Sequence, residues 1–153
     1  QTTLQKYTII RLPLVYGISL KGSLNWFTKL LQDVQNGQTV TLPKNLYTNP
    51  VFSEDVAWGT LKAIERQYVG ILHFGGNSYF SLFEFGRKVT EVFKLPSNLL
   101  QPTRLPSKEQ HGLEKAFAES LLDIKFSTNY EGLIALHYLM NGDRSPFDKL
   151  FQL

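Results

Sequence analysis

The sequence contains no cysteine among its 153 residues, so it can form neither a disulfide nor a thiolate metal site. Its three histidines, His73, His111 and His137, have no metal-binding spacing. No run approaches the roughly 18 apolar residues of a membrane span, and the first residues lack the pattern of a signal peptide. We therefore expect a cytoplasmic protein without a metal site or membrane contact.

The sequence also has no concentration of positive charge. The net charge is +3, and the lysines and arginines are scattered rather than gathered into a stripe with interleaved aromatic residues. A nucleic-acid-binding surface is therefore not expected, although a mildly basic protein suits a phosphate-bearing small molecule. The Gly-x-Ser-x-Gly elbow of the α/β-hydrolases is missing as well.

Apolar residues are plentiful, at 42% of the chain with 11 phenylalanines, which predicts a packed core. The pattern alternates between strands and helices and indicates an α/β fold with parallel pairing. The predicted strands cover 7–16, 39–42, 70–76 and a short stretch near 121–126. The predicted helices cover 23–36, 53–66, 81–94 and 128–140, and 95–113 reads as a long loop. Because these few strands cannot form a complete open sheet, we expect the chain to be part of a larger α/β protein.

Local signals set the ends of the predicted helices. Ser23 can cap the first helix, and Glu54 and Asp55 favour the start of the second. The second helix has an apolar face containing Leu61 and Ile64. Ser81 with Glu84 and Thr128 with Glu131 have the spacing of capping boxes, which predicts where the later helices begin.

The stretch Thr8–Gly17, TIIRLPLVYG, reads as a buried strand, yet it contains Arg11 and Pro13. Proline lacks a backbone N–H and belongs at a strand edge, end or bulge. In an open α/β sheet, strands end at the ligand crevice. The stretch therefore predicts a strand that becomes irregular at such a crevice. The alternative is a structural proline at a strand end, with Arg11 paired to a carboxylate.

Several segments in this order resemble the extended short-chain dehydrogenase/reductases, the family of nucleotide-sugar epimerases, dehydratases and reductases, and most closely those of the dTDP-4-dehydrorhamnose reductase type. IIRLPLVYG resembles the strand that follows the catalytic helix, and NWFTKLL resembles the next helix. NPVFSEDVAWGTLKAI carries the Pro-x-x-x-x-Asp-x-Ala pattern as Pro50, Asp55 and Ala57, and GILHFGG resembles a Gly-x-x-His-x-x-Gly strand. The resemblance is good over roughly residues 7–105 and looser beyond.

The resemblance implies site residues on both sides of a cleft. On the cofactor side, the segment Leu12, Pro13, Leu14 and Val15 would lie beside the nicotinamide of NAD or NADP. On the substrate side, the candidates for contact with a nucleotide-linked sugar are Asn25, Pro50, Phe52 and Lys115. Asn25 can equally be an exposed helix residue, Asp55 reads as a helix-start carboxylate rather than a ligand contact, and His73 reads as a core residue.

The sequence departs from the family pattern in the loop before the last helices. Family reductases often carry an Arg-Pro pair there, and Lys115 and Ala116 stand in its place. Lysine keeps the charge but loses the planar fork that binds a diphosphate through two hydrogen bonds. The resemblance therefore does not imply that the substrate is a thymidine-diphosphate sugar.

Neither a glycine-rich dinucleotide fingerprint nor a Tyr-x-x-x-Lys pair occurs in the sequence. We therefore expect no catalytic residue in this chain. We expect the C-terminal portion of such an enzyme, with the last strand of a Rossmann-type sheet at about 7–17 and a substrate-binding lobe at about 18–153. NAD or NADP would be bound mainly by an N-terminal half of the same protein. The expected partners are that half, a nucleotide-sugar substrate and a second copy of the protein in a homodimer. The alternative is a non-catalytic NAD(P)-binding regulatory subunit resembling the methionine adenosyltransferase β subunit.

Overall fold

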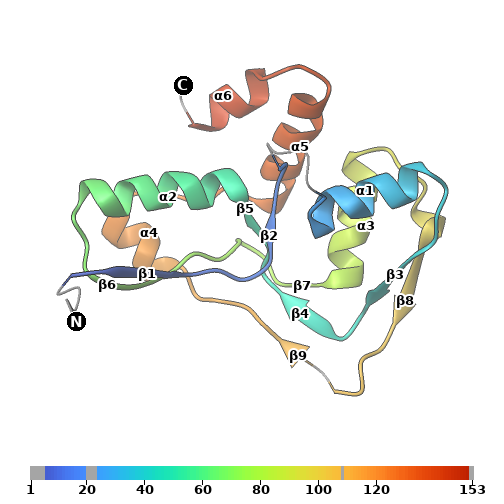
Figure 1. Ribbon diagram of the computed structural model, residues 1–153, viewed down its shortest axis with the longest axis horizontal. Helices are drawn as coiled ribbons and strands as arrows, with labels where there is room; N and C mark the ends of the chain where they lie inside the picture. Colours follow the sequence, from blue (N-terminus) through green and yellow to red (C-terminus); the bar gives the residue numbers. More distant parts are fainter. Residues whose placement is uncertain (1–5, 20–23, 108, 152–153) are drawn as a thin grey trace.

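The computed structural model describes residues 6–19, 24–107 and 109–151 and has a mixed α/β architecture (Figure 1). The helices are α1 (Trp26–Gln35), α2 (Ser53–Glu65), α3 (Leu82–Val92), α4 (Ala116–Leu122), α5 (Asn129–Met140) and α6 (Ser145–Phe151), with a 3-10 turn η1 (Ser97–Leu99). The strands are β1 (Thr8–Arg11), β2 (Val15–Tyr16), β3 (Val40–Pro43), β4 (Leu46–Thr48), β5 (Val51–Phe52), β6 (Gly70–His73), β7 (Phe80–Ser81), β8 (Leu100–Thr103) and β9 (Glu109–Gln110). None of the described helices is long and apolar enough to span a membrane.

Parallel pairing dominates the sheets, as the alternation of elements predicted. β1 pairs with β6, β2 with β5 and β3 with β8, all parallel. A three-stranded sheet has the order β7-β4-β9, in which only β7 is antiparallel to β4. The fold class predicted from the sequence, part of a Rossmann-type α/β architecture, is thus confirmed.

Two hydrophobic clusters hold the elements together. The larger lies between α1, α3 and α5 and is centred on Tyr16, Phe27 and Phe85. The smaller lies between β6, α2 and α4 and contains Leu72 and Phe74. In Figure 1, α2 and α4 lie on one face of the β1–β6 pair, while α1 and α3 lie beside β3 and β8.

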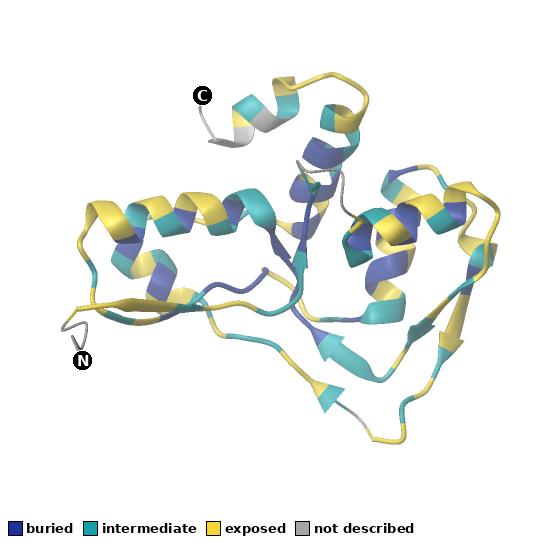
Figure 2. Cartoon of the chain, in the orientation of Figure 1, coloured by how far each residue is buried: buried dark blue, intermediate teal, exposed yellow. Residues whose placement is uncertain are grey.

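The predicted single strand 7–16 is wrong in its extent and burial. β1 ends at Arg11 and β2 begins at Val15, so the chain leaves the ladder around Pro13, as expected for a residue without a backbone N–H. β1 is mostly exposed rather than buried (Figure 2). The reason is that, in the described chain, β1 pairs on one side only and helices cover one of its faces.

The loop predicted over 95–113 and the strand predicted near 121–126 are also wrong. The first region contains η1, β8 and β9, which form by pairing with distant strands. The second contains the end of α4, which stops at Asp123 in the left-handed region with φ 54°. Leu122 is buried because α4 packs against its neighbours. A short apolar run does not show whether its period is that of a helix or that of a strand, so the sequence could not separate the two.

The capping boxes predicted at Ser81–Glu84 and Thr128–Glu131 are confirmed at the starts of α3 and α5. Ser23, the predicted cap of the first helix, lies outside the described residues, and α1 is instead capped by Asn25. His73, expected in the core, is half-buried and lies opposite Arg11 in the β1–β6 register.

Candidate functional site

The segment Leu12–Val15 connects β1 to β2 and carries the irregular backbone predicted at a crevice. Leu12 is 41% exposed. The carbonyl of Leu14 accepts a hydrogen bond from Val51 N at 2.9 Å, which joins the segment to β5. The carbonyl of Val15 accepts one from Trp26 Nε1 at 2.8 Å. The segment is therefore fixed at its β2 end and exposed at its β1 end.

A cavity of about 310 Å³ lies between this segment and α1. Its walls are mainly apolar and come from Leu14, α1, β3 and the start of α3. The lining side chains are Leu14, Trp26, Lys29, Leu30, Asp33, Val40, Leu42 and Leu82. The hydrogen bond from Trp26 to Val15 fixes the indole at the wall, so the cavity is held by the same contact that orients the end of the segment. A mostly apolar hollow with a few charged groups is the usual form of a small-molecule site.

Asn25 lies at the start of α1 and caps it. Its Oδ1 accepts a hydrogen bond from Thr28 N at 2.9 Å, and its Nδ2 donates one to Gly17 O at 2.9 Å. Both ends of the amide thus have backbone partners, which gives Asn25 a structural role. Its predicted contact with a nucleotide sugar stays a prediction.

Pro50 and Phe52, predicted beside the sugar-nucleotide cleft, are buried. Phe52 is 1% exposed, and its ring stacks on Tyr16 with centroids 5.6 Å apart. The Pro50 carbonyl accepts a hydrogen bond from Asn129 Nδ2 at 2.7 Å. The structure therefore places Phe52 in the core, and the two residues form a packed layer rather than an exposed wall.

Lys115 immediately precedes α4, and its ammonium group is already paired. Nζ lies 2.5 Å from Glu119 Oε1 and 5.9 Å from the centroid of the Phe126 ring. The same carboxylate oxygen accepts a hydrogen bond from Phe126 N at 2.9 Å. α4 packs with β6 and α2, whereas Asn25 begins α1 in the other cluster, so the structure does not bring Lys115 and Asn25 together (Figure 1). The contact of Lys115 with a diphosphate stays a prediction.

Two buried polar residues that sequence reasoning missed tie these segments together. Asn49, 2% exposed, accepts from Leu113 N and donates to the carbonyls of Gly76 and Leu113. Asn129, 4% exposed, donates to Pro50. From sequence, Asn49 beside Pro50 reads as a turn and Asn129 as the start of a helix, so only the long-range partners reveal these roles.

The carboxyl group of Asp55, which lies near this layer, has a strongly raised pKa. The residue is 3% exposed, and its carboxylate accepts hydrogen bonds from Ser127 N and Ser127 Oγ, both at 3.0 Å. Burial raises the pKa of Asp55 from 3.8 to about 6, against the lowering effect of the Ser127 hydrogen bonds. Burial and the charge of Asp55 raise the pKa of the Tyr16 hydroxyl far above its usual range. Asp55 thus starts α2 as predicted and also clamps the segment before α5.

Among the described residues, no three or more His, Cys, Asp or Glu side chains gather into a group that could hold a metal ion.

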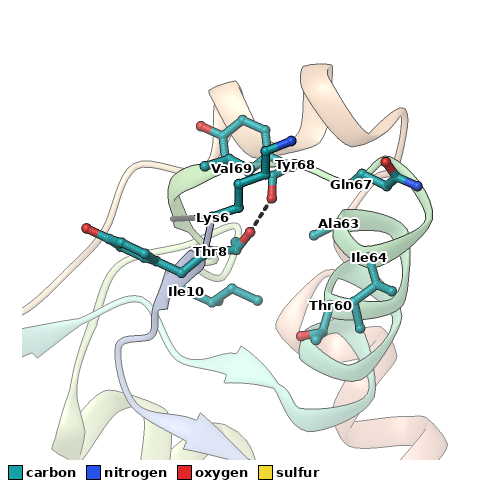
Figure 3. Close-up of a pocket in the computed structure, with 10 residues that line it drawn as sticks. Lys6, Thr8, Ile10, Thr60, Ala63, Ile64, Gln67, Tyr68 and Val69 are labelled. Atoms are coloured by element: carbon teal, nitrogen blue, oxygen red, sulfur yellow. Dashed lines mark hydrogen bonds between the residues drawn. The ribbon is translucent and has the colours of Figure 1, made fainter. Parts of the chain in front are cut away.

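A second hollow, of about 440 Å³, lies between β1 and α2 (Figure 3). Ile10, Ala63 and Ile64 line it, and Thr8 Oγ1 donates to the Tyr68 carbonyl at its edge. Beside it, Leu61 and Ile64, predicted as part of the inner face of α2, are 53% and 66% exposed. Ile9 and Ile71, register partners on the uncovered face of the β1–β6 pair, are 42% and 44% exposed. The exposed apolar residues of α2 and those on the uncovered face of the β1–β6 pair lie on either side of the β1 edge, and both have the composition of contact faces.

Comparison with known proteins adds three findings. Residues 1–130 match the family described as RmlD substrate binding domain. A comparison with curated proteins gives no sequence match. Among solved structures, similar folds occur in dTDP-4-dehydrorhamnose reductase from Yersinia enterocolitica (17% identity, TM-score 0.72, covering 85% of this chain and 48% of that one) and in a dTDP-4-dehydrorhamnose reductase from Clostridium acetobutylicum (15%, 0.73, 88% and 49%).

UDP-glucuronic acid 4-epimerase from Bacillus cereus, solved with UDP-glucuronic acid and NAD, is similar at 17% identity and a TM-score of 0.69, with 88% of this chain and 45% of that one covered. At these identities the likeness concerns the fold. The chain spans about half the length of the structures it matches.

Proposed function

The chain belongs to the RmlD substrate-binding domain family, and from that premise we propose that it is the substrate-binding portion of an NAD(P)-dependent oxidoreductase or epimerase acting on a nucleotide-linked sugar. The observation that carries the proposal is the cavity of about 310 Å³. It joins Leu14, from the segment with the family resemblance on the cofactor side, to the helix α1 on the substrate side. A ligand there would lie between the two.

The roles follow the two sides of the cavity. Leu12, Pro13, Leu14 and Val15 would lie beside the nicotinamide of NAD or NADP; the exposure of Leu12 and the irregular backbone at Pro13 support this. The nucleotide sugar would lie along the start of α1 near Asn25, with Pro50 and Phe52 in the packed layer of the same lobe. Lys115 would have to leave Glu119 to join them.

The uncovered surface of β1 and α2 supports a partner half. A further strand can add to the free edge of β1, and its helix can fill the hollow beside Ile10 and Ile64. We propose that this is where an N-terminal dinucleotide-binding half packs and that it supplies the catalytic tyrosine and lysine. No residue of this chain is proposed as catalytic.

Calorimetric titration with UDP- and dTDP-sugars tests the proposal. Leu14→Trp, which fills the cavity, should weaken binding at least tenfold, because the ligand and the larger side chain compete for the same volume. Met140→Trp, at an exposed position on α5 outside the cavity lining, is the control and should bind as the parent does. Equal affinity in all three proteins, or no binding in any of them, would refute the proposal.

The regulatory-subunit alternative is favoured by one observation, the ion pair that occupies Lys115 where the family pattern has an arginine. A subunit of that kind, with its N-terminal half present, would bind NAD(P) but no nucleotide sugar. The same titration, made on the protein with its N-terminal half and with NAD(P) added as a ligand, separates the two functions.

A further inference from the structure

We propose that Lys29, rather than Lys115, provides the positive charge that meets the diphosphate of the ligand. This inference rests on the proposed function and concerns the same cavity. Lys29 lines the cavity together with Leu14 and Trp26, whereas Lys115 lies in the cluster formed by β6, α2 and α4. The two lysines differ in their own burial and in whether they line the cavity, and both differences favour Lys29.

Lys115 is poorly placed to exchange partners. Its side chain is 15% exposed and that of Glu119 is 19% exposed, so the pair is largely withdrawn from water. If an anion drew Lys115 away, Glu119 would remain beside it, because Phe126 N also holds its carboxylate. A diphosphate at Lys115 would then lie close to the negative charge of Glu119, and its own negative charges would also have to be removed from water.

Lys29 is free of the first obstacle. Its side chain is 62% exposed, while the side chain of its partner Asp33 is 20% exposed and lies one turn further along α1, with carboxylate oxygens 3.0 and 2.8 Å from Nζ. A helical ion pair at this spacing contributes only about 0.3–0.5 kcal/mol, so an incoming dianion can replace the carboxylate as the partner of the exposed ammonium group at little cost, with Asp33 still nearby. Lys29 also follows Asn25 by one turn, which places both on one side of α1.

The shape of the cavity assigns the parts of the ligand. The apolar walls formed by Leu30, Val40 and Leu42 suit a base or another flat apolar group, and the charged rim suits the phosphates. The carboxylate of Asp33 repels anions, so it disfavours a ligand more strongly the greater the negative charge of that ligand. The ligand class is accordingly a sugar linked to a nucleoside diphosphate.

The test compares charge-removing variants by calorimetric titration with a UDP-sugar, a dTDP-sugar and inorganic pyrophosphate. Lys29→Met should weaken nucleotide-sugar binding about five- to thirtyfold, which corresponds to about 1–2 kcal/mol. Asp33→Asn should tighten it about twofold, since the competing pair is lost. Lys62→Met, which removes the lysine of another helical ion pair, with Glu65 on α2, is the control and should leave the affinity unchanged.

The outcomes separate this inference from the function on which it rests. Nucleotide-sugar binding that Lys29→Met does not weaken, or that Lys115→Met weakens instead, overturns the inference and leaves the function standing. If only pyrophosphate binds, and Lys29→Met abolishes that binding, the phosphate site stands and the proposed function fails. If none of these three ligands binds, both the inference and the proposed function fail.

Discussion

Replacing Asp55 by asparagine is expected to change how the stability of this chain depends on pH. The pKa of Asp55 in the folded chain is about 6, above its ordinary value of 3.8, so the folded state binds the proton more tightly than the unfolded state does. The resulting stabilisation is complete below pH 3.8 and is lost as the pH rises through 6. At about 1.4 kcal/mol per pH unit, this interval corresponds to about 3 kcal/mol.

Asparagine suits the test because it can keep both contacts with Ser127. Its oxygen can accept from Ser127 N, and its amide can donate to Ser127 Oγ. Urea denaturation, followed by tryptophan fluorescence at pH 4.5, 5.5, 6.5 and 7.5, should show the variant gaining about 2 kcal/mol relative to the parent across this series, because about 1 kcal/mol of the effect is already lost by pH 4.5. Asp123→Asn, at an exposed left-handed position, is the control. Free energies of unfolding that fall in parallel for the parent and Asp55→Asn would refute the argument.

Two further changes test the packing and the uncovered surface. Gly132→Ala should destabilise the chain by about 1–3 kcal/mol in thermal or urea unfolding, although alanine favours helices, because the added Cβ would lie 2.4 Å from the Tyr16 hydroxyl; unchanged stability would contradict the packing around Tyr16 and Phe52. Ile9→Lys combined with Ile71→Lys should reduce self-association of the purified chain in sedimentation velocity by charging the uncovered face of the β1–β6 pair, and a parent chain that is already monomeric at all concentrations would count against that contact face.

Much of the fold was predictable because its signals are local. Ser81 with Glu84 and Thr128 with Glu131 marked helix starts correctly, since a capping box needs only residues three apart. β8 and β9 were not predictable in this way. Both form through pairing with β3 and β4, far away in the sequence, and their own residues include Pro102 and polar side chains that read as loop.

The candidate site was predictable only in part. The break at Pro13 followed from the chemistry of proline, and the structure confirms it. The roles of Asn25 and Phe52 depended on which groups surround them: the cap of α1 occupies the amide of Asn25, and the Tyr16 ring covers Phe52. The counter-charge on Lys115 was likewise hidden, because an i,i+4 pair on α4 could be recognised only once 116–122 was known to be a helix.

The sequence by itself determined the alternation of strands and helices, the starts of the later helices and the family, because periodicity, capping and the order of motifs are properties of neighbouring residues. The tertiary structure alone decided which lysine borders a cavity, which asparagines hold loops together, and which apolar residues remain uncovered. These depend on what lies within a few ångströms in space, and residues such as Lys29 and Leu14, or Asp55 and Ser127, come together only when the chain is folded.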